Sequence, residues 1–393
     1  MKQAFRFMTC RCYFERNIYI PTVQHHFTFK SDDEFKRTYY AIWKKHWSNK
    51  IAFNDLLTQI KQEIKRRVDT FNDEPNRCRK IAAEYAPLNP EIFKYQENWL
   101  DPNLILLMKN PAVELSKYVV SPGASALGWL NCYHIPVWTK SFCELLAAEI
   151  SSYQRSGCPQ IQPNTMNRDG VVLNEIGFRT HIQCLIERQI EPIAHYAFPD
   201  WVGPVSGLDS FKAFTVDYSA LDETYAPDVI LEKNHDTQLG FHYDNSEVTI
   251  NVCLSDVSDY EGSELYFSAA EPGRGMVMES SHNFSPSLLT TGVPPLRHRK
   301  GWGFLHVGRQ YHGALEITRG RRRNVIIWMR SSDIRNRNCP MCNSKPKMIP
   351  VSDGIHPEGD NQKSFIGFGD GFTQDVNKDE LKERDGSEYC VLM

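Results

Sequence analysis

The strongest constraint on the fold is a group of five short runs, rich in β-branched and aromatic residues, between residues 211 and 329. They read FKAFTVDY, EVTINVCL, SELYF, GWGFLHV and RNVIIWM, and turn-forming residues separate them. Runs of this composition bounded by turn residues predict β-strands. Because no helical pattern is interleaved among them, the sequence predicts a sandwich or a jelly roll (double-stranded β-helix) rather than a parallel sheet.

The run EVTINVCL shows the alternation of a strand with one buried face. Its apolar residues occupy every second position, from Val248 to Leu254, and Thr249, Asn251 and Cys253 lie between them. This period of two predicts a half-buried strand. A long loop is expected over residues 269–297, before the last two runs.

The N-terminal third has helical patterns instead. Ser31 and Glu34 form a capping-box pattern at the head of FKRTYYAIWKKHW. A second segment predicts a core-facing stripe of Phe53, Leu56, Ile60, Ile64, Val68 and Phe71, with a solvated basic face of Lys61, Lys65, Arg66 and Arg67. Further helices are predicted in SFCELLAAEISSY, where Phe142, Leu145, Leu146 and Tyr153 share one face, and in LIERQIEPIAHYAF.

These patterns predict an α+β chain in three parts. Residues 1–125 form a mostly helical N-terminal region, residues 126–345 form a domain with a β-rich core at 211–331, and residues 346–393 form a disordered tail rich in Gly and Asp.

The composition excludes several classes of protein. A net charge of −3 over 393 residues gives no overall attraction to nucleic acid or to anionic membranes, so a nucleic-acid oxidising enzyme, which needs a basic groove, is not favoured. The N-terminus has no apolar signal-peptide core, and no stretch reaches the length of a membrane span. We therefore expect a cytoplasmic or nuclear protein whose 11 scattered cysteines are mostly free, buried thiols.

A His-x-Asp pattern stands at the rim of the strand-rich region, in QLGFHYDNSEVTINVCL. His242 and Asp244 are two residues apart, so on an extended segment they project to the same side. A non-haem iron centre for O₂ chemistry takes two imidazoles and one carboxylate on one face of the metal and leaves the other face open. The third ligand must come from another strand, and we expect a second His near a fixed cation.

The stretch GWGFLHVGRQYHGALEITRGRRRNVIIWM supplies both groups. His312 is followed ten residues later by Arg322, on a predicted strand. A forked guanidinium suits a bidentate grip on a carboxylate such as the distal one of 2-oxoglutarate. His306 is an alternative ligand, but the residue ten positions later is Glu316, whose charge would repel a dicarboxylate.

Three ordered pieces between residues 211 and 331 resemble the catalytic domain of the iron- and 2-oxoglutarate-dependent dioxygenases, in the prolyl 4-hydroxylase and procollagen lysyl hydroxylase branch. The pieces are FHYDNSEVTINVCLSDV, DYEGSELYF and KGWGFLHVGRQYHGALEITRGRRRNVIIW. The flanks PNTMNRDGVVLNEIG (163–177) and IRNRNCPMC (334–342) extend the resemblance to one poorly characterised group of this family, over most of residues 1–345.

The resemblance implies that His242, Asp244 and His312 hold Fe(II), that Arg322 binds the 2-oxoglutarate carboxylate, and that Tyr218 is a second hydrogen-bond donor to it. It also implies O₂ as a cosubstrate, ascorbate as the reductant that rescues the iron, and hydroxylation of a C–H bond with release of succinate and CO₂. This branch favours an amino-acid side chain of a protein as substrate, although collagen is not expected without a secretory signal.

Residues around the expected site qualify the resemblance. The segment between Tyr218 and the His-x-Asp pattern, 23 residues, is longer than the usual family segment, and Ser263 stands where the family commonly has the second Gly of a Gly-Gly turn. We expect the cost of Ser263 to be small, because Ser tolerates turn geometries that do not need positive φ. Arg321 and Arg323 flank Arg322 and should face the opposite side, as solvated or ion-paired side chains.

Cysteine pairs and the C-terminus carry two further patterns. Cys339 and Cys342 form a CxxC pair that could be half of a zinc site with the distant pair Cys10-x-Cys12, or a pair of buried thiols. Residues 390–393, CVLM, form a C-a-a-X box with Met last, which favours farnesylation of Cys390 and weak membrane association. The KDEL sequence at 378–381 is internal, so it is not expected to act as a retention signal. His356-Pro-Glu is incidental. The alternative function is an inactive jelly-roll binding module docked through the prenylated tail.

Overall fold

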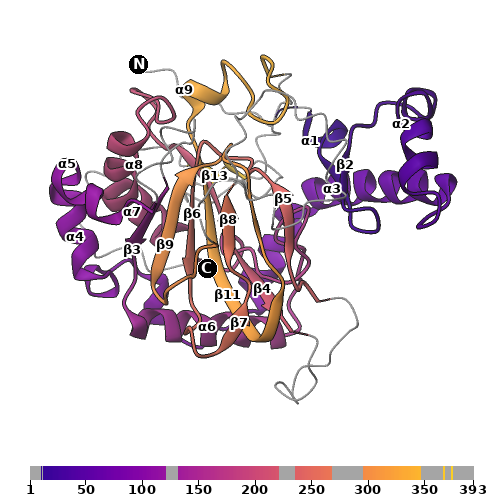
Figure 1. Cartoon of the computed structure of the whole chain (residues 1–393). Helices are drawn as coiled ribbons and strands as arrows, with labels where there is room; N and C mark the ends of the chain where they lie inside the picture. The colour runs from indigo at the N-terminus through magenta and orange to yellow at the C-terminus, as the bar shows by residue number, and fades with distance from the viewer. Residues whose placement is uncertain are drawn as a thin grey trace, which may run out of the picture.

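The computed structural model of the protein describes residues 10, 12–120, 132–220, 235–267 and 295–346, together with 366–367 and 373–374. A large and a small antiparallel sheet form its centre, helices between residues 90 and 197 pack against the larger sheet, and helices before residue 85 extend on the other side (Figure 1). Within these residues, no helix is both long enough and apolar enough to cross a membrane.

The larger sheet contains the long strand β11 at its centre. In order its strands are β12 (Ile366–Gly367), β13 (Thr373–Gln374), β4 (Ser210–Ser219), β11 (Ile317–Arg330), β6 (Val248–Cys253), β9 (Trp302–Val307) and β3 (Tyr133–Pro136), and β7 (Tyr260–Gly262) also pairs with β11. The smaller sheet has the order β5 (Leu239–His242), β10 (His312–Ala314) and β8 (Leu265–Phe267). The five expected runs fall on β4, β6, β8, β9 and β11, so the predicted α+β jelly-roll class is confirmed.

Strand β6 differs from its prediction, because it is buried on both faces. The alternation is present, but the polar side chains of Thr249, Asn251 and Cys253 are as inaccessible as the apolar ones between them. The apolar face packs into the main core under the helices, and the polar face lines the interior between the sheets. Alternation alone identifies two chemically different faces and does not say what covers the polar one.

The helices form two groups. Those that cover the larger sheet and build the main core are η1 (Pro90–Phe93), η2 (Glu97–Trp99), α4 (Pro102–Lys109), α5 (Pro111–Glu114), η3 (Leu115–Tyr118), α6 (Lys140–Arg155), α7 (Arg179–Leu185), η5 (Ile186–Ile190) and α8 (Glu191–Ala197). Helix α6 buries Phe142, Leu146 and Tyr153 as predicted. The predicted helix around Pro192 contains a π turn, η5, just before the proline, which accommodates its missing N–H.

The N-terminal unit, which we define as residues 18–64, is stabilised by a small hydrophobic core of its own. It contains β1 (Ile18–Ile20), β2 (His25–Phe27), α2 (Asp32–His46) and the first part of α3 (Phe53–Glu84), packed around Phe27, Phe35 and Trp47. The predicted cap is confirmed, because the Ser31 side chain accepts from the Glu34 amide. In Figure 1 this unit projects from one side of the sheets.

The predicted basic face of α3 is wrong at Arg67. This side chain is 2% exposed, and its guanidinium donates to the carbonyl oxygens of Tyr13, Arg16 and Asn17 at 2.7–3.0 Å. These carbonyl groups lie in and just after the single turn α1 (Cys12–Glu15), and a helix of one turn has no backbone N–H groups left to bind them. Conversely Val68, predicted to face the core, is 38% exposed.

Candidate active site

The smaller sheet brings two histidines and an aspartate together. His242 ends β5 and is the register partner of His312, the first residue of β10. Asp244 follows two residues after His242, and its carboxylate lies 3.6 Å from the Nε2 of His242 and 3.8 Å from that of His312. One ligand atom from each residue lies within 4.8 Å of the other two.

Hydrogen bonds fix the orientation of each group. The Nδ1 atoms of His242 and His312 lie 2.8 Å from the carbonyl oxygens of Gly240 and Gln310, respectively. A carbonyl only accepts, so Nδ1 carries the proton and each Nε2 offers a lone pair to the centre of the group. The Asp244 carboxylate accepts from the Thr249 hydroxyl at 2.8 Å, on the inner face of β6.

The buried setting also fixes the charges. Burial lowers the pKa of His242 and of His312 to about 4, and the proximity of the two rings adds to the shift at His242. Burial raises the pKa of Asp244 to about 6, against the opposing effects of His242 and Thr249. At neutral pH the group is therefore two neutral imidazoles and one carboxylate, which is the protonation state that a divalent metal requires.

Arg322 and Tyr218 face the same cavity as this group. They are register partners on β11 and β4, and the Arg322 guanidinium lies over the Tyr218 ring. Both are almost completely buried, and the empty space that they line with His242, Asp244 and His312 is about 430 Å³, part of it open to solvent. A buried cation therefore stands in one cavity with the possible metal ligands.

Ser263 holds the Arg322 guanidinium through its backbone. Its carbonyl oxygen accepts from the Arg322 Nη1, and Gly262 and Ser263 both have positive φ, +77° and +61°. The expectation of a small cost at Ser263 is therefore wrong, because this turn does need the left-handed conformation that non-glycine residues adopt at a cost. The second glycine of the usual pair would relieve it.

Sequence reasoning missed Asn167 and His298. Asn167 donates to the Tyr218 hydroxyl at 3.2 Å, and the Nδ1 of His298 lies 3.2 Å from the Nη1 of Arg322. Both residues lie outside regular elements, so no periodicity pointed to them. The signal that could have found Asn167 was its position in the flank at 163–177, which carries part of the family resemblance.

The structure also separates the alternatives. His306 packs its ring 4.8 Å from that of His312, but it lies outside the group of possible metal ligands. Arg321 and Arg323 both pair with Asp217, at 3.0 and 2.6 Å, away from the cavity, so the ion-paired interpretation of these arginines is confirmed.

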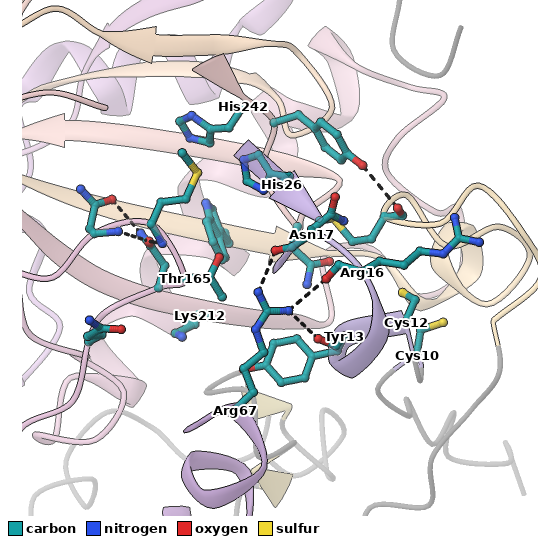
Figure 2. Close-up of a pocket in the computed structure, with 18 of the residues that line it drawn as sticks. Cys10, Cys12, Tyr13, Arg16, Asn17, His26, Arg67, Thr165, Lys212 and His242 are labelled. Atoms are coloured by element: carbon teal, nitrogen blue, oxygen red, sulfur yellow. Dashed lines mark hydrogen bonds between the residues drawn. The ribbon is translucent and has the colours of Figure 1, made fainter. Parts of the chain in front are cut away.

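A larger pocket leads from His242 to the N-terminal unit and beyond it. Its empty space is about 1370 Å³, part of it open to solvent, and Phe241, Tyr243 and Tyr311 line it beside His242. Figure 2 shows His26 of the N-terminal unit beside His242, with Cys10 and Cys12 toward the other end of the pocket. The N-terminal segment therefore forms one wall of the approach to the candidate site.

The four cysteines of the two predicted pairs meet at the end of this pocket. The sulfurs of Cys10, Cys12, Cys339 and Cys342 lie within 4.8 Å of one another. Cys390, His356 and nearly all of the predicted loop at 269–297 lie outside the described residues.

Comparison with known proteins agrees with the resemblance in the sequence. A family model described as an OGFOD2-like domain matches residues 81–203. The 2-oxoglutarate and iron-dependent oxygenase domain-containing protein 2 of Xenopus tropicalis is 33% identical, over 98% of this chain and 97% of its own, and that of Homo sapiens is 32% identical over 94% of each.

More distant similarities reach the lysyl and prolyl hydroxylases. Procollagen-lysine,2-oxoglutarate 5-dioxygenase 1 of Gallus gallus is 26% identical over 58% of this chain and 28% of its own. A solved prolyl-4-hydroxylase of Pseudomonas putida has 13% identity and a TM-score of 0.33, over 59% of this chain and 97% of its own. On the near full-length similarity to the first group, the chain belongs to the family of the 2-oxoglutarate and iron-dependent oxygenase domain-containing protein 2.

Proposed function

We propose that this chain is an Fe(II)- and 2-oxoglutarate-dependent dioxygenase in which His242, Asp244 and His312 hold the iron and Arg322 binds the distal carboxylate of 2-oxoglutarate. The observation that carries the proposal is the convergence of two Nε2 lone pairs and a carboxylate at one point of a cavity that also contains a buried guanidinium.

The donor set fits the metal. Two imidazoles and one carboxylate are the ligands of non-haem Fe(II) oxygenases, and three protein ligands leave positions for other molecules. The carbonyls of Gly240 and Gln310 orient the rings, and Thr249 orients the carboxylate, as partners of metal ligands commonly do.

The cavity also fits the cosubstrate. Arg322 Nε is buried and has no hydrogen-bond partner among the residues that the structure describes, so a carboxylate at this position would satisfy it. Tyr218 and Asn167 line the same space, and we propose the Tyr218 hydroxyl as a second donor to 2-oxoglutarate. Bound together, Fe(II), 2-oxoglutarate and O₂ supply oxidation of a C–H bond coupled to release of succinate and CO₂, with ascorbate as the reductant that restores the iron.

We further propose an amino-acid side chain of a protein as the substrate. The similarity to a procollagen-lysine dioxygenase supports this class. The larger pocket supports it as well, because it leads to His242 and its aromatic lining can enclose a long side chain. The cytoplasmic or nuclear location and the farnesylation of Cys390 stay predictions from sequence.

The first experiment measures iron content and succinate formation from 2-oxoglutarate by the full-length, Fe(II)-loaded protein. Asp244→Ala should lose the iron, and Arg322→Ala should keep the iron but lose succinate formation at ordinary 2-oxoglutarate concentrations. Arg321→Ala is the matched control, since its side chain pairs with Asp217 away from the cavity. Full iron retention by Asp244→Ala would disprove the ligand assignment, and iron-loaded wild type without succinate would favour the inactive binding module.

A further inference from the structure

Four cysteines from the two ends of the described chain form one cluster. Cys10 and Cys12 precede and begin α1, whereas Cys339 and Cys342 follow α9 (Ser332–Arg335), more than 300 residues later. All ten cysteines in the described residues are free thiols. A grouping of four thiols from such distant segments needs a physical reason, since a thiol can pack at many other places in a core.

The distances between the sulfurs fit a single metal ion. The sulfurs of Cys12 and Cys339 lie 3.6 Å apart, and those of Cys10 and Cys342 lie 4.0 Å apart. A disulfide would require about 2.05 Å. Zinc–sulfur bonds of about 2.3 Å in tetrahedral geometry place the ligand sulfurs roughly 3.8 Å from one another. A multi-iron cluster would bind the four sulfurs to different metals and would space them further apart.

The turn from Cys339 to Ser344 aims its two sulfurs at the same point. The Cys339 amide donates to the Ser344 carbonyl at 2.9 Å, the Asn343 amide donates to the Cys339 carbonyl at 2.8 Å, and Asn343 has φ +54°. The resulting tight turn places Cys339 and Cys342 in one group of four sulfurs with Cys10 and Cys12.

We propose that Cys10, Cys12, Cys339 and Cys342 bind a structural zinc ion. Tetrahedral sites of four thiolates hold zinc or an iron–sulfur centre, and the distances between these sulfurs exclude a multi-iron cluster. Four thiolates leave no open position for a substrate, so the zinc site is structural rather than catalytic. It is distinct from the iron site, since none of its ligands belongs to the His242 group.

The zinc would fix a wall of the substrate pocket. Helix α1 is a single turn that could not persist alone, and its Tyr13 lines the pocket. Zinc would hold the start of α1, and Arg67 holds its end. The Tyr243 hydroxyl also donates to the Met341 carbonyl at 3.3 Å. This bond links the turn that carries Cys339 to the residue between the two iron ligands His242 and Asp244.

Measurement of the zinc and iron content of the full-length protein tests the proposal without an activity assay. We expect one zinc per chain in the wild type and the loss of zinc, with iron retained, in Cys12→Ser. Cys132→Ser is the matched control, because Cys132 is as buried as Cys12, each being 9% exposed, and lies outside the cluster. Asp244→Ala should show the reverse pattern, keeping zinc and losing iron. Equal zinc in Cys12→Ser and wild type would overturn the proposal, as would iron in place of zinc.

A second measurement on the wild type covers the case in which Cys12→Ser does not fold. Titration with an organomercurial should release the zinc in step with modification of four thiols, and the zinc-depleted chain should be cleaved faster by trypsin after Arg16, which is exposed beside α1. Tetrahedral cobalt–thiolate absorption after cobalt replaces zinc would support the same ligand set. Wild-type protein that contains no zinc after growth with zinc would refute the site.

Discussion

The Arg322 guanidinium lies over the Tyr218 ring, with 4.8 Å between the Arg322 Cζ and the ring centroid. The stacking orients the forked donor within the buried cavity, and a lysine could neither stack nor bind a carboxylate with two parallel hydrogen bonds. Since hydrogen bonds to charged groups contribute about 1.5–3 kcal/mol, Arg322→Lys should raise the KM for 2-oxoglutarate roughly 10- to 100-fold. Succinate formation against 2-oxoglutarate concentration measures it, and an unchanged KM would remove Arg322 from the cosubstrate site.

The variant Tyr218→Phe tests the role of the Tyr218 hydroxyl separately from that of its ring. The ring would remain beneath Arg322, but the hydroxyl that accepts from Asn167 would be lost, together with its own proton as a donor. We expect a rise in the KM for 2-oxoglutarate of roughly 10-fold or more, since a hydrogen bond to a charged carboxylate contributes about 1.5–3 kcal/mol. The same titration measures it, and iron content should not change. A variant with wild-type KM would leave Tyr218 a packing role alone.

Ser263→Gly should stabilise the protein. Ser263 has φ +61°, and its buried hydroxyl has no partner among the described residues. A left-handed conformation costs a non-glycine residue about 1–2 kcal/mol, which glycine would avoid. Glycine also loses more conformational entropy on folding, and this loss offsets part of the stabilisation. The net gain should be about 1 kcal/mol or less, a rise in Tm of about 2 °C by thermal denaturation.

Ser263→Ala is the control for this change. Alanine removes the unpaired hydroxyl but keeps the strained φ, so its stability should fall below that of the glycine variant. The KM for 2-oxoglutarate should stay near the wild-type value in both, because Arg322 binds the backbone carbonyl of Ser263. A glycine variant less stable than wild type would show that the strain is relieved elsewhere.

The regular elements were predictable because each repeats a local pattern. Alternation located β6, and the capping pair Ser31 and Glu34 located the start of α2. What local patterns could not give is the partner of a side chain. Arg67 is a charged residue in a basic stretch, which predicts a solvated side chain, and only the fold brings the end of α1 to it. The positive φ of Ser263 likewise depends on the position of Glu316, the residue just before β11, whose carbonyl oxygen accepts from the Ser263 amide at 3.0 Å.

The residues of the candidate sites also divide into those that local sequence patterns predicted and those that they did not. His242 and Asp244 are close in sequence, and the spacing of His312 and Arg322 on a strand-rich stretch was enough to single them out. The sequence named the two cysteine pairs as possible halves of one site but could not decide between that and separate buried thiols, because 327 residues separate Cys12 from Cys339 and no local spacing relates them.

The buried pair of Asp217 and Arg323 predicts a pH dependence of stability. Burial alone would raise the pKa of Asp217, but Arg323 and then Arg321 outweigh it and hold this pKa at about 2. A carboxyl with a lowered pKa stabilises the fold above its unfolded value of about 3.9, and this contribution is lost as the pH falls toward 2. Asp217→Asn should cost about 3–5 kcal/mol at neutral pH, since it leaves Arg323 buried without its counter-charge.

Urea unfolding of wild type and Asp217→Asn at several pH values measures this dependence. The difference in unfolding free energy should stay constant from pH 7 to about 4 and should narrow below it, as Asp217 becomes protonated in the wild type. A difference that is constant down to pH 2.5, or that grows as the pH falls, would contradict the assignment.

Arg67→Met should release the N-terminal segment while the sheets stay folded. The variant keeps an apolar stem but leaves the carbonyls of Tyr13, Arg16 and Asn17 without their buried donor. At about 1.5–3 kcal/mol for hydrogen bonds to a charged group, local opening and cleavage after Arg16 should become roughly 10- to 100-fold faster. Arg66→Met is the matched control, because Arg66 is 30% exposed and pairs only with Glu63 in the described chain. Equal trypsin cleavage rates in the two variants would show that Arg67 does not hold the pocket wall.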